Sequence, residues 1–197
     1  MTHLKSLSSK RNTTTTTTLS PTQRILQWNK KRNNLKYDID LETKMLTEEA
    51  NEFFVAETLV DRLDAFADFA FVAIGTAMKY MAVKHKDFHN LDIDKADFEA
   101  LSEYINTVQS QMGTMLYEEV SALKTSMLYE DENGDTDLSK LLEDVLLIVI
   151  SANEAKGFEL NADGKVMKPE GFVKPEAQID NLLKKTLGAN YVPYVFG

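Results

Sequence analysis

The sequence has no cysteine, and it has only four prolines and eight glycines in 197 residues. The lack of cysteine excludes disulfides, thiolate metal sites and a cysteine nucleophile, and it is typical of proteins in a reducing compartment. We therefore expect a cytoplasmic protein. The scarcity of proline and glycine leaves long stretches of chain in which helices can continue without a break.

The chain also lacks a net positive charge and long apolar runs. The net charge is −9 at pH 7, which argues against a general phosphate-binding surface for DNA or RNA. The longest apolar stretches, 69–74 and 145–150, have the length of core segments and fall far short of a membrane-spanning helix. We expect neither a nucleic acid polymer nor a membrane as a partner.

Residues 1–19 differ in composition from the rest of the chain. They carry basic residues, no acidic residue and an unbroken run of threonines at 13–18. This low-complexity composition predicts a disordered basic tail. Residues 20–187 are expected to form a single helical domain, followed by a C-terminal tail at 188–197.

Two capping boxes mark the starts of helices, Ser-Pro-Thr-Gln at 20–23 and Thr-Leu-Val-Asp at 58–61. No glycine or proline separates the second helix from the third, so the pair is either an antiparallel hairpin or one continuous helix. Gly113 is the candidate break in the fourth helix. Strand-like alternation is almost absent, which predicts an all-α helical bundle. The expected helices run from 21 to about 33, 41 to 56, 59 to about 83, 94 to about 129, 137 to about 156 and 176 to 187.

Five carboxylates gather on the second and third predicted helices. At about 100° per residue, Glu48, Glu49 and Glu52 fall within roughly one third of a helix circumference. Asp64 and Asp68 are four residues apart and share a face of the next helix. If the turn lies at residue 58, an antiparallel pair places Glu52 level with Asp64, and Glu48 level with Asp68. The two acidic sets therefore meet if their faces are turned toward each other.

Asp68 sharpens this pattern, because its neighbours in the sequence are almost all apolar. A buried, unpaired carboxylate is costly or changes its protonation state, and like charges four apart repel. No lysine or arginine of the same helix faces Asp68. Hard oxygen ligands favour Mg²⁺ or Mn²⁺, so the set predicts a divalent metal site. The competing interpretation is a solvated face for Glu48 and Glu49, and Asp61 is best explained as a helix cap.

Four segments of the chain, in order, resemble those of the all-α nucleoside triphosphate pyrophosphohydrolases, the superfamily of MazG-like and phosphoribosyl-ATP pyrophosphohydrolase-like proteins. The first is the EExxE motif at 48–52, and the second, 64–77, resembles the DALxDxxYVxxGTA run of phage and bacterial members. The third, 151–156, is similar to the aNMxK segment, and the fourth, 168–175, to KPxGWxxP. The resemblance covers roughly residues 20–85 and 140–187.

The chain departs from this family pattern at several positions. The usual second acidic motif is ExxD, but Ala65 stands three residues before Asp68, so Asp64 has to serve instead. Phe71 replaces the tyrosine of the second segment, and Phe172 replaces the tryptophan of the fourth. Residues 86–139 have no match in the family pattern and are expected to be an insertion.

The resemblance implies a helical bundle of the pyrophosphohydrolase type and metal-dependent hydrolysis of a nucleoside or deoxynucleoside triphosphate, or a related nucleotide, to the monophosphate and pyrophosphate. It implies Mg²⁺, with Mn²⁺ as the alternative, and assembly as a homodimer or homotetramer. Glu48 or Glu49 would act as the base. The implied metal ligands are Glu48, Glu49, Glu52, Asp64 and Asp68, and the implied substrate-binding residues are Asn153, Lys156, Lys168 and Trp28.

Alternatives remain open at the level of sequence. For the whole chain, the main alternative to the enzyme is a non-catalytic helical interaction protein with a degenerate acidic site. Lys156, beside Gly157 at a helix end, also fits routine pairing with the helix dipole, and Trp28 also fits a core position.

Overall fold

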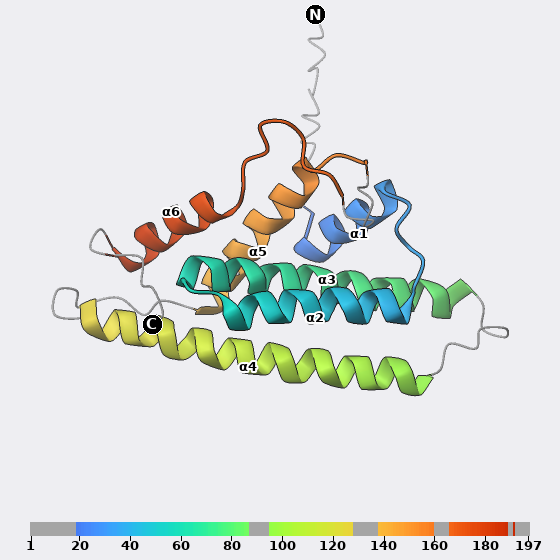
Figure 1. The fold of residues 1–197 in the computed structure, drawn as a ribbon, viewed down its shortest axis with the longest axis horizontal. Helices are drawn as coiled ribbons and strands as arrows, with labels where there is room; N and C mark the ends of the chain where they lie inside the picture. The colour runs from blue at the N-terminus through green and yellow to red at the C-terminus, as the bar shows by residue number, and fades with distance from the viewer. Residues whose placement is uncertain (1–18, 87–94, 128–137, 160–165, 189–190, 192–197) are drawn as a thin grey trace, which may run out of the picture.

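The computed structural model of the protein describes residues 19–86, 95–127, 138–159, 166–188 and 191, and all regular secondary structure in these ranges is helical (Figure 1). The prediction of an all-α protein is therefore confirmed. Residues 1–18 of the predicted tail lie outside the described residues. The same holds for 130–136, where the acidic and glycine-containing composition predicts a loop, and for 161–164, where Asn-Ala-Asp-Gly predicts a tight turn. The helices are α1 Pro21–Lys31, α2 Ile39–Val55, α3 Leu59–Lys86, α4 Lys95–Met127, α5 Leu138–Ala155 and α6 Glu176–Leu187.

The predicted capping box at Ser20 is complete, and the one at Thr58 forms in part. The Ser20 hydroxyl accepts a hydrogen bond from the Gln23 N–H at 3.3 Å, and the Gln23 side chain accepts one from the Ser20 N–H at 2.9 Å. The Thr58 hydroxyl accepts from the Asp61 N–H at 3.1 Å and donates to the Asp61 carboxylate at 2.7 Å. Each cap satisfies backbone donors that the first helical turn leaves without partners, which stabilises a helix by about 1 kcal/mol.

Helices α2 and α3 form an antiparallel hairpin, which settles the choice that the sequence left open. Ala56 is extended and ends α2, and α3 begins at Leu59. In the predicted register Glu42 stands level with residue 74. Its actual partner is Thr76, whose hydroxyl donates to the Glu42 carboxylate at 2.6 Å. The observed partner is thus two residues from the predicted one, as expected when side chains lean toward the N-terminus of their own helix.

Helix α3 is the centre of the bundle and packs against each of the other helices (Figure 1). Leu63, Ala67 and Phe69 are fully buried along it. By length and composition alone, Leu59–Ala82 would suffice to cross a membrane. In the structure this segment belongs to α3, the helix around which the others assemble. Its central position explains why its composition is so apolar over this length.

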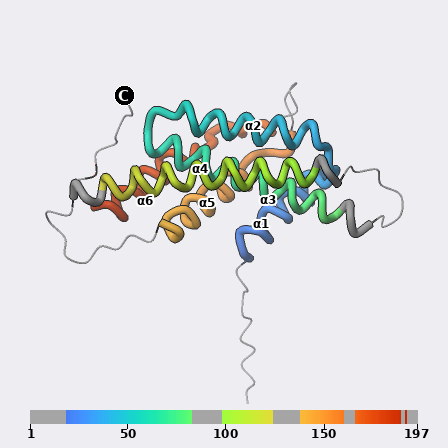
Figure 2. Tube along the Cα trace, turned by 90° about the horizontal axis from the view of Figure 1, so that it is seen from below, coloured from blue at the N-terminus to red at the C-terminus, as the bar shows by residue number. Residues whose placement is uncertain are grey.

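Helix α4 comes from the segment 86–139 that matched no family pattern. It runs alongside α2 and α3 (Figure 2) and covers the apolar back of the hairpin with a buried stripe at helical spacing. The helix continues through Gly113, so the candidate break is absent. An added Cβ at this position would meet no atom within 4 Å. The stripe consists of Leu101, Val108, Met112, Leu116 and Val120.

Helices α5 and α6 lie on the other side of α3 from α4 (Figure 1). Gly188 ends α6 with φ 93°, a left-handed conformation that glycine adopts without strain. Tyr191 follows and is buried in the main core, so this residue of the predicted C-terminal tail packs against the domain.

Candidate functional site

Asp64 and Asp68 lie one turn apart on α3, and both side chains are partly buried. Asp68 contacts Asn153 of α5. One carboxylate oxygen of Asp64, Oδ1, is buried and has no hydrogen-bond partner among the described residues. A buried acceptor without a partner is costly, and a bound ion or water is one explanation for such an atom.

Burial and like charge disfavour the ionised forms of both carboxyls. Burial raises the pKa of Asp64 to about 7, and the charges of Asp68 and Glu176 add to this effect. Burial also raises the pKa of Asp68, while Lys156 and a hydrogen bond from Asn153 oppose that shift. The pair is therefore only partly compensated by the protein itself.

The compensating groups come from the C-terminal end of α5. The Asn153 side chain donates to Asp68 Oδ1 at 3.4 Å and to the Val149 carbonyl at 3.1 Å. The Lys156 ammonium donates to Asn153 Oδ1 at 2.7 Å. Burial lowers the pKa of Lys156, and the charge of Asp68 opposes this. Lys156 therefore faces the aspartates, which is more than the dipole pairing that its place at a helix end would require.

Lys156 also connects the acidic residues of α2 with those of α3. The charges of Asp68, Glu49 and Asp64 all raise its pKa, whereas the nearby Lys168 lowers it. Lys168 acts in the same way on Asp68, whose pKa it lowers. Among the predicted residues, the structure thus brings together the following set: Glu49, Asp64, Asp68, Asn153, Lys156 and Lys168.

The other predicted acids stand at the margin of this set. Glu48 is half-buried on α2, and Glu52 on the same helix is exposed. Asp61 caps α3 through Thr58, as the sequence indicated. Its charge still reaches the site, because it contributes to the raised pKa of Asp64.

Glu176 is a site residue that the sequence analysis missed. It opens α6, its charge raises the pKa of both Asp64 and Asp68, and its Oε2 is buried without a hydrogen-bond partner among the described residues. Its other oxygen accepts from Lys174 at 3.1 Å. The available signal was weak, because an acidic residue in the first turn of a helix is normally explained by the helix dipole.

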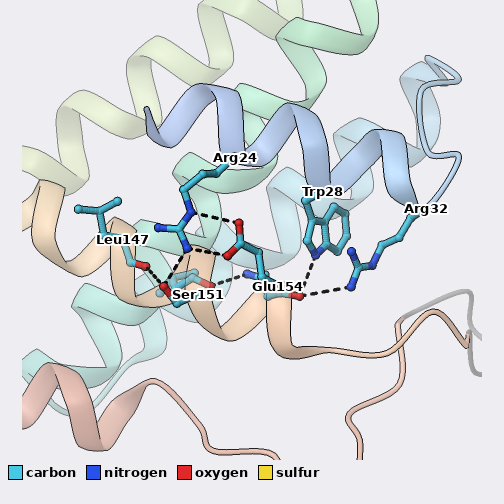
Figure 3. A network of polar contacts seen from close by, with 8 residues as sticks. Arg24, Trp28, Arg32, Leu147, Ser151 and Glu154 are labelled. Atoms are coloured by element: carbon cyan, nitrogen blue, oxygen red, sulfur yellow. Dashed lines mark hydrogen bonds and ion pairs between the residues drawn. The ribbon is translucent and has the colours of Figure 1, made fainter. Parts of the chain in front are cut away.

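Helix α1 holds the end of α5 in place (Figure 3). Arg24 forms an ion pair with Glu154 at 2.6 Å and donates to the Ser151 hydroxyl at 3.0 Å. The Trp28 indole N–H donates to the Asn153 carbonyl at 2.8 Å, and Phe71 packs edge-on against its ring. Trp28 is thus built into the packing between α1, α3 and α5, which favours the core interpretation of this residue.

Arg32 secures the last turn of α5 and the two residues that follow it. Its Nη2 donates to the Lys156 carbonyl at 2.7 Å, the Gly157 carbonyl at 3.1 Å and the Asn153 carbonyl at 3.5 Å. The last carbonyls of a helix lack partners within the helix and carry partial negative charge, so a guanidinium suits them. Arg32 and Trp28 together fix the backbone that carries Asn153 and Lys156.

The donor set suits a hard cation. Within the described part of the chain, no three acidic or histidine side chains stand close enough together to enclose an ion by themselves. Mg²⁺ is usually held by one or two carboxylates, with water and substrate phosphate oxygens completing its shell. Asp64 and Asp68 offer such a pair of carboxylates, and Asp64 Oδ1 accepts no hydrogen bond from the described residues.

A second buried charge cluster on the α2–α3 hairpin was not predicted. Glu42 accepts a hydrogen bond from Thr76 and one from the Lys79 ammonium at 2.7 Å. All three side chains are at most 3% exposed. Every charge in this cluster has a partner, so the cluster is complete without a ligand.

A hollow in the described surface lies elsewhere, between α2 and α4. Its lining includes Ile39, Thr43 and Tyr104, and Asp40 is the one carboxylate there. The hollow lacks a cluster of charged groups, so it has no chemistry comparable with that of the Asp64–Asp68 site.

No family model, no curated protein and no solved structure matches this chain.

Proposed function

We propose that this protein is a metal-dependent nucleotide pyrophosphohydrolase of the all-α type. It hydrolyses a nucleoside or deoxynucleoside triphosphate, or a related nucleotide, to the monophosphate and pyrophosphate. The observation that carries the proposal is the buried Asp64–Asp68 pair. These carboxyls keep raised pKa values and a partnerless oxygen although Lys156 lies beside them.

The chemistry of the set matches the reaction. Asp64 and Asp68 would hold Mg²⁺ or Mn²⁺, which offsets the negative charge that develops on the phosphates. Lys156 and Lys168, whose charges act on Asp68, would supply positive charge for the phosphate oxygens. Asn153 keeps the ammonium of Lys156 and the carboxylate of Asp68 at a fixed separation through its two hydrogen bonds.

The attacking water requires a carboxylate that is not occupied by the cation. Glu49 and Glu48 remain the candidates, as in the family resemblance, and Glu49 is the one whose charge acts on Lys156. Glu52 would contribute to cation binding from the margin of the site.

Pyrophosphate release tests this proposal. The measurement uses a panel of canonical and modified nucleoside triphosphates with Mg²⁺, and with Mn²⁺ in a second series. Asp68→Ala and Glu49→Ala should abolish release while circular dichroism shows the helical content unchanged. Asp144→Ala is the matched control, because it removes a carboxylate from α5 whose partner is the exposed Lys140. Unchanged turnover in both site variants would overturn the assignment.

A further inference from the structure

Phe158 is a large apolar side chain that the structure leaves 68% exposed immediately after α5. Exposed apolar residues are common and by themselves need no explanation. This one differs, because the Arg32 guanidinium lies over its ring, with Cζ 4.9 Å from the ring centroid. The guanidinium therefore supports the ring by a cation–π contact, while most of the ring's surface faces solvent.

The group behind the ring is itself rigidly placed. The same guanidinium stacks on Trp28, with Cζ 4.3 Å from the indole centroid, so the three side chains form a stack of indole, guanidinium and phenyl ring. Arg32 is further anchored by its hydrogen bonds to the carbonyls of Lys156 and Gly157. A solvent-exposed ring with a fixed support loses little conformational entropy when another flat group stacks on it.

The backbone of this segment is also fixed, next to the site. The Gly157 N–H donates to the Met167 carbonyl at 3.3 Å, and the Met167 N–H donates to the Glu159 carbonyl at 2.7 Å. These bonds join the segment that carries Phe158 to the segment that carries Lys168. Lys156 and Lys168, the two cations that act on Asp68, are thus close neighbours of Phe158 along the two paired segments.

We propose that Phe158 is the platform on which the base of the bound nucleotide stacks, while the phosphates of the same nucleotide meet Lys156 and Lys168. This inference rests on the proposed function and specifies how the substrate is oriented. A nucleotide joins a flat aromatic base to a polyanion, and the structure joins a supported aromatic ring to a pair of lysines. Stacking accepts every base, because each base has a π-face, so Phe158 provides affinity without choosing among bases.

Calorimetric titration with two kinds of ligand tests the proposal. The ligands are hydrolysis-resistant α,β-methylene analogues of one purine and one pyrimidine nucleoside triphosphate, and inorganic tripolyphosphate, all with Mg²⁺. Phe158→Ala should raise the Kd of both analogues about tenfold, the size expected for loss of one stacking contact, and leave that of tripolyphosphate unchanged. Phe158→Trp, which keeps an aromatic surface, should restore affinity for the analogues.

Tyr117→Ala is the matched control. Tyr117 is an aromatic residue of similar exposure, 62%, on α4, which lies on the other side of α3 from α5 (Figure 1). Its removal should change no Kd.

The outcomes separate this inference from the proposed function. If the wild-type protein binds the analogues and Phe158→Ala binds them equally well, the stacking platform is wrong and the proposed function stands. An equal loss for tripolyphosphate would also overturn the platform, because Phe158 would then support the phosphate site or the fold. If the wild-type protein binds neither kind of ligand, the proposed function fails and the platform fails with it.

Discussion

The α2–α3 hairpin carries two buried charge clusters, and they differ in whether the protein completes them. In the first, Glu42 receives hydrogen bonds from Thr76 and Lys79, and no charge is left over. In the second, Asp64 and Asp68 stand side by side with raised pKa values. The first cluster is a closed internal network, and the second retains capacity for a ligand.

The difference shows why burial of charge alone does not indicate a functional site. A buried ion pair with good geometry can be a purely structural feature, and removing one partner leaves the other charge buried without compensation. A carboxyl with a buried oxygen that has no partner, as at Asp64, carries an uncompensated desolvation penalty in the folded protein. The comparison therefore predicts that the two clusters respond oppositely to mutation, pH and divalent cations.

The largest effect on stability is expected from removing the lysine of the closed Glu42–Lys79 cluster. Lys79→Met leaves the fully buried Glu42 without its cationic partner, which should lower the free energy of unfolding by about 3–5 kcal/mol. Lys156→Met removes the corresponding lysine from the other cluster. Because burial already lowers the pKa of Lys156, we expect a loss below about 1 kcal/mol together with a marked loss of turnover.

Chemical denaturation of both lysine variants measures this contrast. Equal destabilisation by the two substitutions would show that Lys156 is as much a structural residue as Lys79, and it would remove the distinction between the clusters.

A smaller effect is expected from Thr76→Val, which keeps the shape of the side chain and removes its hydrogen bond to Glu42. Loss of a bond to a charged group should cost about 2 kcal/mol. Thr114→Val is the control, because its hydroxyl donates to the Ser110 carbonyl at an exposed position, and its removal should cost less than about 0.5 kcal/mol. Neither value should change when Mg²⁺ is added, and a clear Mg²⁺ dependence for Thr76→Val would contradict the closed nature of this cluster.

The smallest effect is a pH dependence at Asp64. Its pKa is about 7 in the folded protein and 3.8 for the unperturbed group. Between these pH values the folded state keeps a proton that the unfolded state releases, so stability falls as pH rises from about 4 toward 7. Asp64→Asn does not titrate. The full shift corresponds to about 2.6 kcal/mol between pH 5 and pH 8. Because solvent screens a partly exposed carboxyl, we expect the stability of the wild type relative to this variant to drop by about 1–2 kcal/mol over this range without divalent cations.

Unfolding curves of wild type, Asp64→Asn and the exposed control Asp144→Asn at the two pH values check this sign. If the stability of the wild type relative to Asp64→Asn stays constant or increases as pH rises, Asp64 is compensated in the folded protein and the prediction is wrong.

The features that depend on residues close together in the sequence were predicted well. The capping box at Ser20 formed as predicted, and Thr58 caps α3 through its hydroxyl. The predicted hairpin register was within two residues of the observed contact between Glu42 and Thr76. Gly113 did not break α4, because packing of the stripe along α2 and α3 outweighs the modest cost of one glycine inside a long helix.

The cross-helix contacts did not follow from the sequence. Pairing of Glu42 with Lys79 depends on the rotation of both helices about their axes, which periodicity defines only coarsely. Glu176 acts on Asp68 from 108 residues further along the chain, and nothing local distinguishes it from an ordinary first-turn acid. The sequence indicated the acids of α3 but not the charges that surround them.

The most direct test of the open Asp64–Asp68 cluster is thermal unfolding with Mg²⁺ and an α,β-methylene nucleoside triphosphate, each alone and both together, for wild type and Asp68→Asn. At ligand concentrations of about 100 times the Kd, we expect the two together to raise the wild-type Tm by roughly 5–10 °C and to leave that of Asp68→Asn unchanged. An equal rise in both proteins, or no rise in the wild type, would contradict a cation and nucleotide site at these carboxylates.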